Sequence, residues 1–252
     1  MRKLLLTLSA FFLLTQLHAQ KIEIAVQANS GLFHYSGNAS TASTFFLPGS
    51  AASQYRSNNP YGSENGFSYG AGMQAQFVGK SGFILGLQAG YDLFRSKEAI
   101  NGVYPYNNSY APDFYTIATA NAIPFSASGE AFIVNQDITL NPYIGYRLQA
   151  KKIKIDLMPG VDISYNFSSY NKGNATASDG TAYKADYNLD KAPTDVRLRF
   201  GAAAWYNRWG ITASYAHGLI NYTSNLDYLG AAAGPNTVNS EVIRFGIIYR
   251  IF

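Results

Sequence analysis

Apolar residues occupy every odd position of one fifteen-residue run, from Ile153 to Phe167. The even positions between them are mostly polar or small, as in Lys154, Asp156 and Asp162. Successive side chains of a strand point to opposite faces, so this run predicts a strand with one apolar and one polar face. An ordinary strand has about 5–6 residues. Fifteen residues at roughly 3.3 Å each, tilted by about 45°, rise about 35 Å, which is enough to cross a bilayer.

Seven further segments show the same period of two, which predicts an all-β chain with eight strands. With the run at Lys152–Phe167, they are about Lys21–Tyr35, Gly66–Val78, Gly82–Arg95, about Asp137–Gln149, Asp195–Tyr206, Gly210–Tyr222 and Glu241–Phe252. Three connections between them are tight, and four are long: about residues 36–65, 96–136, 167–194 and 223–240.

Short and long connections alternate along the chain, as in outer-membrane barrels with short periplasmic turns and long extracellular loops. The pattern therefore predicts a transmembrane antiparallel up-and-down β-barrel. Aromatic residues near both strand ends, such as Tyr165 and Tyr222 at one end and Trp209 at the other, predict two interfacial girdles. Ten strands are the alternative, if Phe114–Ile123 pairs with Glu130–Asp137 and joins the ring; a hairpin of these two segments above the membrane is the other option.

The polar face of these strands carries many charges, which a membrane barrel turns toward its lumen. By parity, Glu23, Asp92 and Arg250 point inward as well. Eight strands leave room only for side chains inside, and a buried charge is retained when it is paired. We therefore predict a structural lumen charge network rather than an ion path, formed by Asp156, Asp162, Lys154, Arg147, Arg197, Arg199 and Arg244.

Two irregularities lead to specific predictions about register. The apolar parity of the seventh strand breaks near its end, which predicts a bulge at Ala216–Gly218 that keeps His217 away from lipid. If Leu148 pairs with Ile153 across the turn, Pro142 and Pro159 lie opposite each other. Because proline lacks the ladder donor, we expect a local distortion of the sheet there.

The N-terminus has the pattern of an export signal. Arg2 and Lys3 precede an apolar stretch, and Ala19 supplies a small residue before the cut. We predict a signal peptide at residues 1–19 and a barrel domain at residues 20–252. After residue 20 there is no apolar run near 18 residues, so helical membrane spans are not expected.

Composition and motifs argue against several function classes. The net charge is only +4 with no long basic run, and there is no cysteine, so neither a nucleic-acid partner nor a thiolate metal site is expected. The predicted mature chain has two histidines, His34 and His217, and no G-x-S-x-G or H-E-x-x-H motif, so we predict no enzyme and no cofactor. Acidic loop residues are too widely spread to specify a calcium site.

The predicted loops are rich in Tyr and Phe together with Ser, Asn and Gly. That composition suits an adaptable binding surface. The other interpretation is that these aromatic side chains pack over the barrel mouth.

Several short stretches carry a family resemblance: Ala19-Gln20, the strand Asn141–Arg147, the run Lys152–Phe167 and the aromatic C-terminus Tyr249–Phe252. With them the chain resembles the small outer-membrane β-barrel proteins of Gram-negative bacteria, grouped as porin-like or outer-membrane-protein β-barrel domain families. The resemblance implies a location in the outer membrane and insertion by the barrel assembly machinery. One departure is that Phe252 is out of phase with the lipid-facing residues of the last strand.

These observations together predict a structural role, or a binding and adhesion role through the long external loops. A narrow porin-like channel for small solutes is the alternative, and an outer-membrane enzyme is the third hypothesis. We expect a monomer whose partners are outer-membrane lipid, the barrel assembly machinery during insertion and an extracellular ligand at the loops.

Overall fold

The computed structural model describes residues 21–48, 54–104, 124–223 and 236–252. The predicted signal peptide and the segment Phe114–Ile123 lie outside these residues. Within the described ranges, no helix has the length and apolar character needed to cross a membrane.

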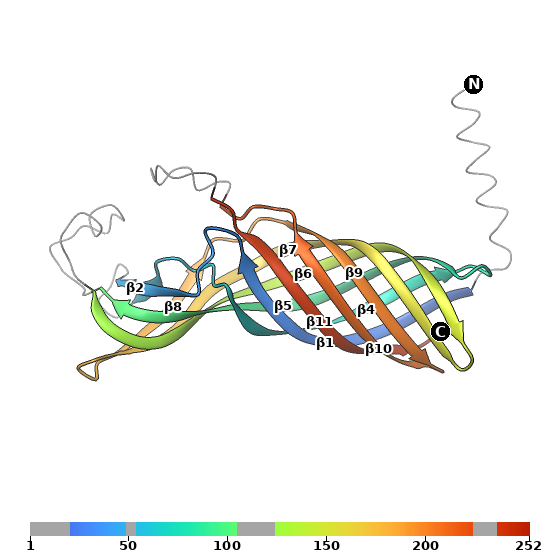
Figure 1. Cartoon of the computed structure of the whole chain (residues 1–252), viewed down its shortest axis with the longest axis horizontal. Coiled ribbons are helices and arrows are strands. Elements are labelled where there is room, and N and C mark those ends of the chain that lie inside the picture. The colour runs from blue at the N-terminus through green and yellow to red at the C-terminus, as the bar shows by residue number, and fades with distance from the viewer. Residues whose placement is uncertain (1–20, 49–53, 105–123, 224–235) are drawn as a thin grey trace, which may run out of the picture.

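Eight strands form a closed antiparallel ring (Figure 1). Along the ring, β1 pairs with β4, then come β5, β6, β7, β9, β10 and β11, and β11 pairs again with β1. These strands correspond in number and order to the eight that the alternation predicts. Their bounds are β1 Lys21–Ser36, β4 Glu64–Val78, β5 Phe83–Val103, β6 Phe125–Ala150, β7 Ile153–Ala177, β9 Asp195–Tyr206, β10 Trp209–Gly218 and β11 Asn239–Arg250.

The exterior of the ring is apolar and the interior is polar. On β5, Phe83, Leu85 and Leu87 are 52%, 56% and 47% exposed, whereas Gln88, on the opposite face of the strand, is 4% exposed. Large exposed apolar side chains of this kind occur on all eight strands. A water-soluble barrel would bury such residues inside, so this arrangement is that of a barrel surrounded by lipid.

Short turns gather at the end of the ring that carries the C-terminus (Figure 1). They are residues 79–82, 151–152 and 207–208. Trp209 and Tyr206 beside one of these turns are exposed, as expected for a girdle. Tyr222 is different: it is only 7% exposed and turns into the ring, so its predicted girdle position is wrong.

At the opposite end, β5, β6 and β7 continue beyond the apolar belt and build a second ring, here called the upper ring. Three shorter strands complete it: β2 (Ser43–Pro48), β3 (Tyr55–Ser57) and β8 (Ala182–Leu189). β8 pairs with β7, β3 with β8 and β2, and β2 with β5. Figure 1 shows β2 and β8 at this end.

Three segments predicted to be loops contain strands of the upper ring: residues 36–65 hold β2 and β3, and residues 96–136 and 167–194 hold parts of longer strands. β6 is 26 residues long and β7 is 25 residues long, so much of residues 96–136 and 167–194 is strand. Outside the bilayer a strand needs no apolar outer face, and therefore the alternation stops while the strand continues. Both edges of Glu130–Asp137 pair with β5 and β7, so this segment belongs to β6 and offers no edge to Phe114–Ile123.

The predicted bulge at Ala216–Gly218 is wrong. β10 pairs without interruption through His217 with Glu241 on one side and Leu198 on the other. A bulge lies instead on β7, where Gln136 opposes Ser168 but Asp137 opposes Asn166, which leaves Phe167 as the extra residue. That bulge exchanges the parity of β7 between the membrane ring and the upper ring.

The predicted hairpin register is also wrong, by two residues. Ala150 opposes Ile153 and Leu148 opposes Ile155, so Pro142 and Pro159 are offset rather than opposed. The expected disturbance is nevertheless visible. Between Leu140 and Tyr146, Tyr143 is the only residue of β6 that remains paired with β7, although the register does not change. Because the prolines are offset, the two missing backbone N–H donors lie at different positions along the strand pair. The sheet tolerates two separate losses more easily than two losses at one position.

Candidate functional site

Ten charged side chains fill the membrane ring and pair with one another. Every one comes from a strand, and partners come mostly from different strands. The acids are Glu23, Asp92, Asp156, Asp162 and Asp195, and the bases are Arg147, Arg197, Arg199, Arg244 and Arg250.

Near the short turns, Arg147 bridges two buried carboxylates. Its Nε donates to Asp156 Oδ1 at 2.6 Å, and its Nη1 donates to Glu23 Oε1 at 2.9 Å. Trp205 Nε1 donates to the other oxygen of Asp156 at 2.9 Å. The guanidinium of Arg250 lies 3.0 Å from Glu23 and over the Trp205 ring. Charge-assisted hydrogen bonds thus satisfy both acids.

Asp162 is the centre of the middle layer. It is fully buried and receives hydrogen bonds from Arg244 at 2.9 Å and Arg199 at 3.2 Å. Arg244 also contacts Asp92, at 3.3 Å. These contacts join β5, β7, β9 and β11 across the lumen.

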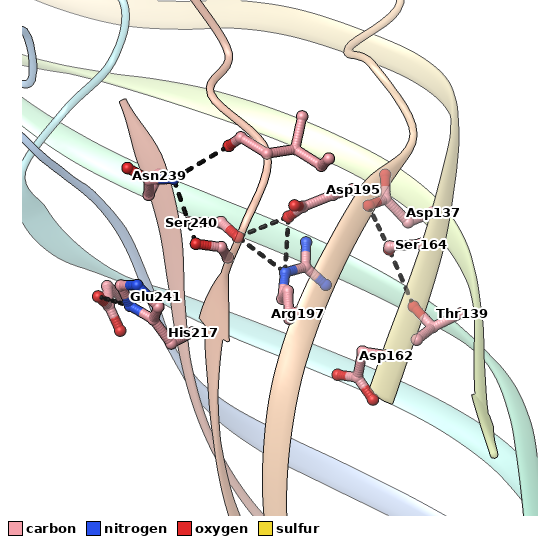
Figure 2. Close-up of polar contacts among 12 residues, drawn as sticks. Asp137, Thr139, Asp162, Ser164, Asp195, Arg197, His217, Asn239, Ser240 and Glu241 are labelled. Carbon is pink, nitrogen blue, oxygen red and sulfur yellow. Dashed lines mark hydrogen bonds and ion pairs between the residues drawn. The ribbon is translucent and has the colours of Figure 1, made fainter. Parts of the chain in front are cut away.

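The third layer lies toward the upper ring. Arg197 contacts Asp195 at 2.7 Å and donates to Ser240 Oγ at 2.8 Å, and Ser240 donates to Asp195 (Figure 2). The hydroxyl of Tyr222 also donates to Asp195, at 2.9 Å. The guanidinium of Arg197 lies 4.8 Å from the centre of the Phe94 ring.

An aromatic cap covers this layer. It consists of five side chains in edge or stacked contact, with ring centres 5.0–6.3 Å apart: Phe33, Tyr35, Tyr61, Phe94 and Tyr222. The hydroxyl of Tyr35 accepts a hydrogen bond from Asn135 at 2.8 Å. The cap joins the apolar core cluster that separates the charged lumen from the upper ring.

Six of the seven residues predicted for the lumen charge network lie in these layers. Lys154 does not: it lies at the short-turn end and makes no ion pair with any described residue. The structure adds Glu23, Asp92, Arg250 and Asp195. Parity points the first three inward, and Asp195 shares the parity of Arg197, so that signal extends to it as well.

The upper ring has its own interior. Its apolar core comprises Phe46, Tyr55, Ile100, Val103, Ala131, Ala175 and Ala185. Glu98 also points inside and is 1% exposed, and neither of its carboxyl oxygens has a hydrogen-bond partner in acceptable geometry among the described residues. Burial raises the pKa of Glu98 to about 8, although the hydroxyl of Ser57 opposes that rise. Sequence patterns do not single out Glu98, because it falls in a predicted loop.

The remaining cluster with potential chemistry is the pair of His217 and Glu241 on the outside of the barrel. His217 Nδ1 lies 2.6 Å from Glu241 Oε1 (Figure 2). The hydroxyls of Tyr215 and Ser36 also contact Glu241. A nucleophilic triad needs a hydroxyl on the imidazole. Ser36 instead contacts the carboxylate. His34 pairs in register with Glu241 across the sheet, on the neighbouring strand. Within the described ranges, no group of three or more His, Cys, Asp or Glu could hold a metal ion.

Replacing Arg147 by Met should destabilise the folded barrel by about 3–5 kcal/mol, because Glu23 and Asp156 would remain buried without their main partner. The measurement is urea-induced unfolding of the chain folded in lipid vesicles. Lys97→Met is the matched control, since Lys97 pairs with Glu64 and Glu130 in exposed positions and should matter little. Equal losses for the two variants would contradict the structural role of the network.

Glu98 should make the upper ring pH-dependent. Because its pKa is raised from 4.5 to about 8, the folded state retains a proton that the unfolded state releases between these values. Stability of the upper ring should therefore be highest below about pH 4.5 and fall as pH rises to about 8. Amide exchange of β2, β3 and the end of β5, corrected for the intrinsic rate, should speed up over this window. Glu98→Gln should abolish the trend, and a trend that survives this change would refute the assignment.

Comparisons with known proteins give distant likenesses. No protein-family model matches the chain, and no curated protein matches it. Among solved structures, it is similar to Neisserial surface protein A, with 13% identity, 90% of this chain and 96% of that chain covered, and a TM-score of 0.35. It is also similar to Ail, the attachment invasion locus protein of Yersinia pestis, with 10% identity, 91% and 98% covered, and a TM-score of 0.31.

The class of the chain therefore rests on its own geometry. Eight antiparallel strands close without a free edge, large apolar side chains cover the outside, and paired charges fill the inside. Only a closed barrel satisfies its backbone hydrogen bonds across a bilayer with strands. This chain therefore has the fold of a transmembrane antiparallel β-barrel.

Proposed function

We propose that the protein is a non-conducting barrel that holds the upper ring outside the cell as a binding surface. The observation that carries this proposal is the continuous filling of the lumen. Three layers of ion pairs and the aromatic cap follow one another along the barrel axis.

The dimensions of the interior support a closed lumen. The cavity at its centre, beside Arg199, Arg244 and Gln88, has a volume of about 20 Å³. Such a space holds roughly one water molecule. A hydrated ion could pass only if several buried ion pairs separated together, and each separation would leave uncompensated charges in a low-dielectric interior.

Exposed aromatic side chains of the upper ring support the binding role. Phe125 on β6 and Tyr187 on β8 are 50% and 39% exposed, well beyond the lipid-facing belt. Exposed aromatic side chains on rigid strands provide contact area at low entropic cost. The paired strands beneath them hold these side chains in place, which favours recognition by a preformed surface.

A planar-bilayer recording tests whether the lumen conducts. The purified chain should insert without discrete current steps, because the ion-pair layers and the cap block the lumen. A wide porin in the same bilayer is the positive control. Regular open steps from the wild-type chain would overturn the closed-lumen proposal and favour the narrow channel.

Surface variants test the binding role. Cells that display the chain are applied to an array of extracellular glycans and proteins. Phe125→Ser combined with Tyr187→Ser should lower any retention by about tenfold, since exposed aromatic residues often dominate binding energy. Leu219→Ser, which is exposed outside the upper ring, is the control and should change nothing. Absence of retention on every array member, or equal retention by both variants, would count against a binding role.

A further inference from the structure

The short-turn end of the barrel is hollow. Two adjoining cavities of about 510 and 690 Å³ lie there, and Lys21 and Lys154 line both of them. We call this joint space the vestibule. Its floor is the layer formed by Arg147 and Glu23, so the vestibule ends where the filled lumen begins. Each cavity has the size of an ordinary small-molecule site.

The vestibule is strongly cationic. Besides Lys21 and Lys154, its walls carry Lys80, Arg147, Arg208 and Arg250. Glu23 is the one acidic side chain among the lining residues, and it is already occupied by Arg147 at 2.8 Å and Arg250 at 3.0 Å.

Three of these cations lack an ion-pair partner among the described residues. Lys80, Lys154 and Arg208 make no ion pair within the part of the chain that the structure describes. Like charges on a concave wall attract anions from solution and raise their local concentration.

Arg250 adds a buried donor. Its side chain is 7% exposed, lines the larger cavity and packs 4.3 Å from the centre of the Trp205 ring. Its Nε has no hydrogen-bond partner among the described residues. A buried guanidinium N–H without an acceptor is costly, and an anion bound at this wall would place a counter-charge beside that guanidinium.

We propose that the vestibule binds a small polyanion carrying phosphate or carboxylate groups, from the periplasmic side. Lys154 stands between the two cavities and contacts such a ligand from either one. Lys21, Lys80 and Arg208 supply further donors at the rim. The site is independent of the upper ring, because the filled lumen separates them.

Trp205 provides a direct reporter of binding. The chain contains two tryptophans, and Trp209 is exposed on the barrel exterior. In a Trp209→Phe background, folded in nanodiscs of zwitterionic lipid, pyrophosphate and citrate are titrated separately at constant ionic strength. We expect a saturable change in Trp205 fluorescence with at least one of them. A response to pyrophosphate alone assigns a phosphate ligand, and a response to citrate alone assigns a carboxylate ligand.

Charge variants give the decisive comparison. Lys154→Gln should lower the affinity for the anion by about fivefold to tenfold, as expected for the loss of one charge-assisted contact in a partly open site. Lys154→Arg should retain most of the wild-type affinity. Lys184→Gln removes the same charge from an exposed position on the upper ring and should leave the affinity unchanged. The proposal is overturned if neither anion gives a saturable response, or if the two Gln variants bind equally well.

Discussion

The pairing of buried charges across the lumen is the interaction on which the rest of the structure depends. Arg147 connects β6 to β1 and β7, and Arg244 connects β11 to β5 and β7. Backbone ladders link only neighbouring strands, whereas these contacts span the ring. An apolar filling would also be stable, but paired charges add direction, since each guanidinium fits only where its carboxylates lie. Strand register, lumen filling and closure are therefore coupled.

Much of the membrane ring could be predicted from sequence, because lipid imposes a strict period of two on every crossing strand. Parity alone separated the outward row, such as Leu85 and Leu87, from inward residues such as Asp156. The same signal failed beyond the bilayer, where β6 and β7 continue without an apolar outer face. It also failed at Tyr222, whose aromatic ring suggested a girdle although its hydroxyl binds a buried aspartate.

Register was harder to predict than strand position. A shift of two residues keeps every side chain on its proper face, so parity could not detect the error at Ala150 and Ile153. A bulge could not be placed from local sequence either: His217 tolerates its exposed position because Glu241 pairs with it, whereas the extra residue Phe167 fits an apparently regular alternation. In the candidate site, Lys154 has the right parity but lies too close to the end of its strand to reach an acid.

The parity change at Phe167 has a consequence for how a partner can approach. Because β7 continues past it, β8 and β2 can cover the outer edges of β7 and β5, and strand addition by a guest peptide is blocked there. Among the described residues, the ring closes between β3 and β8 through the single pair Tyr55 and Ala185. That seam is the thinnest part of the described upper ring, so it is where a guest strand can enter. Along the other described strand pairs of this ring, a partner must be recognised through side chains.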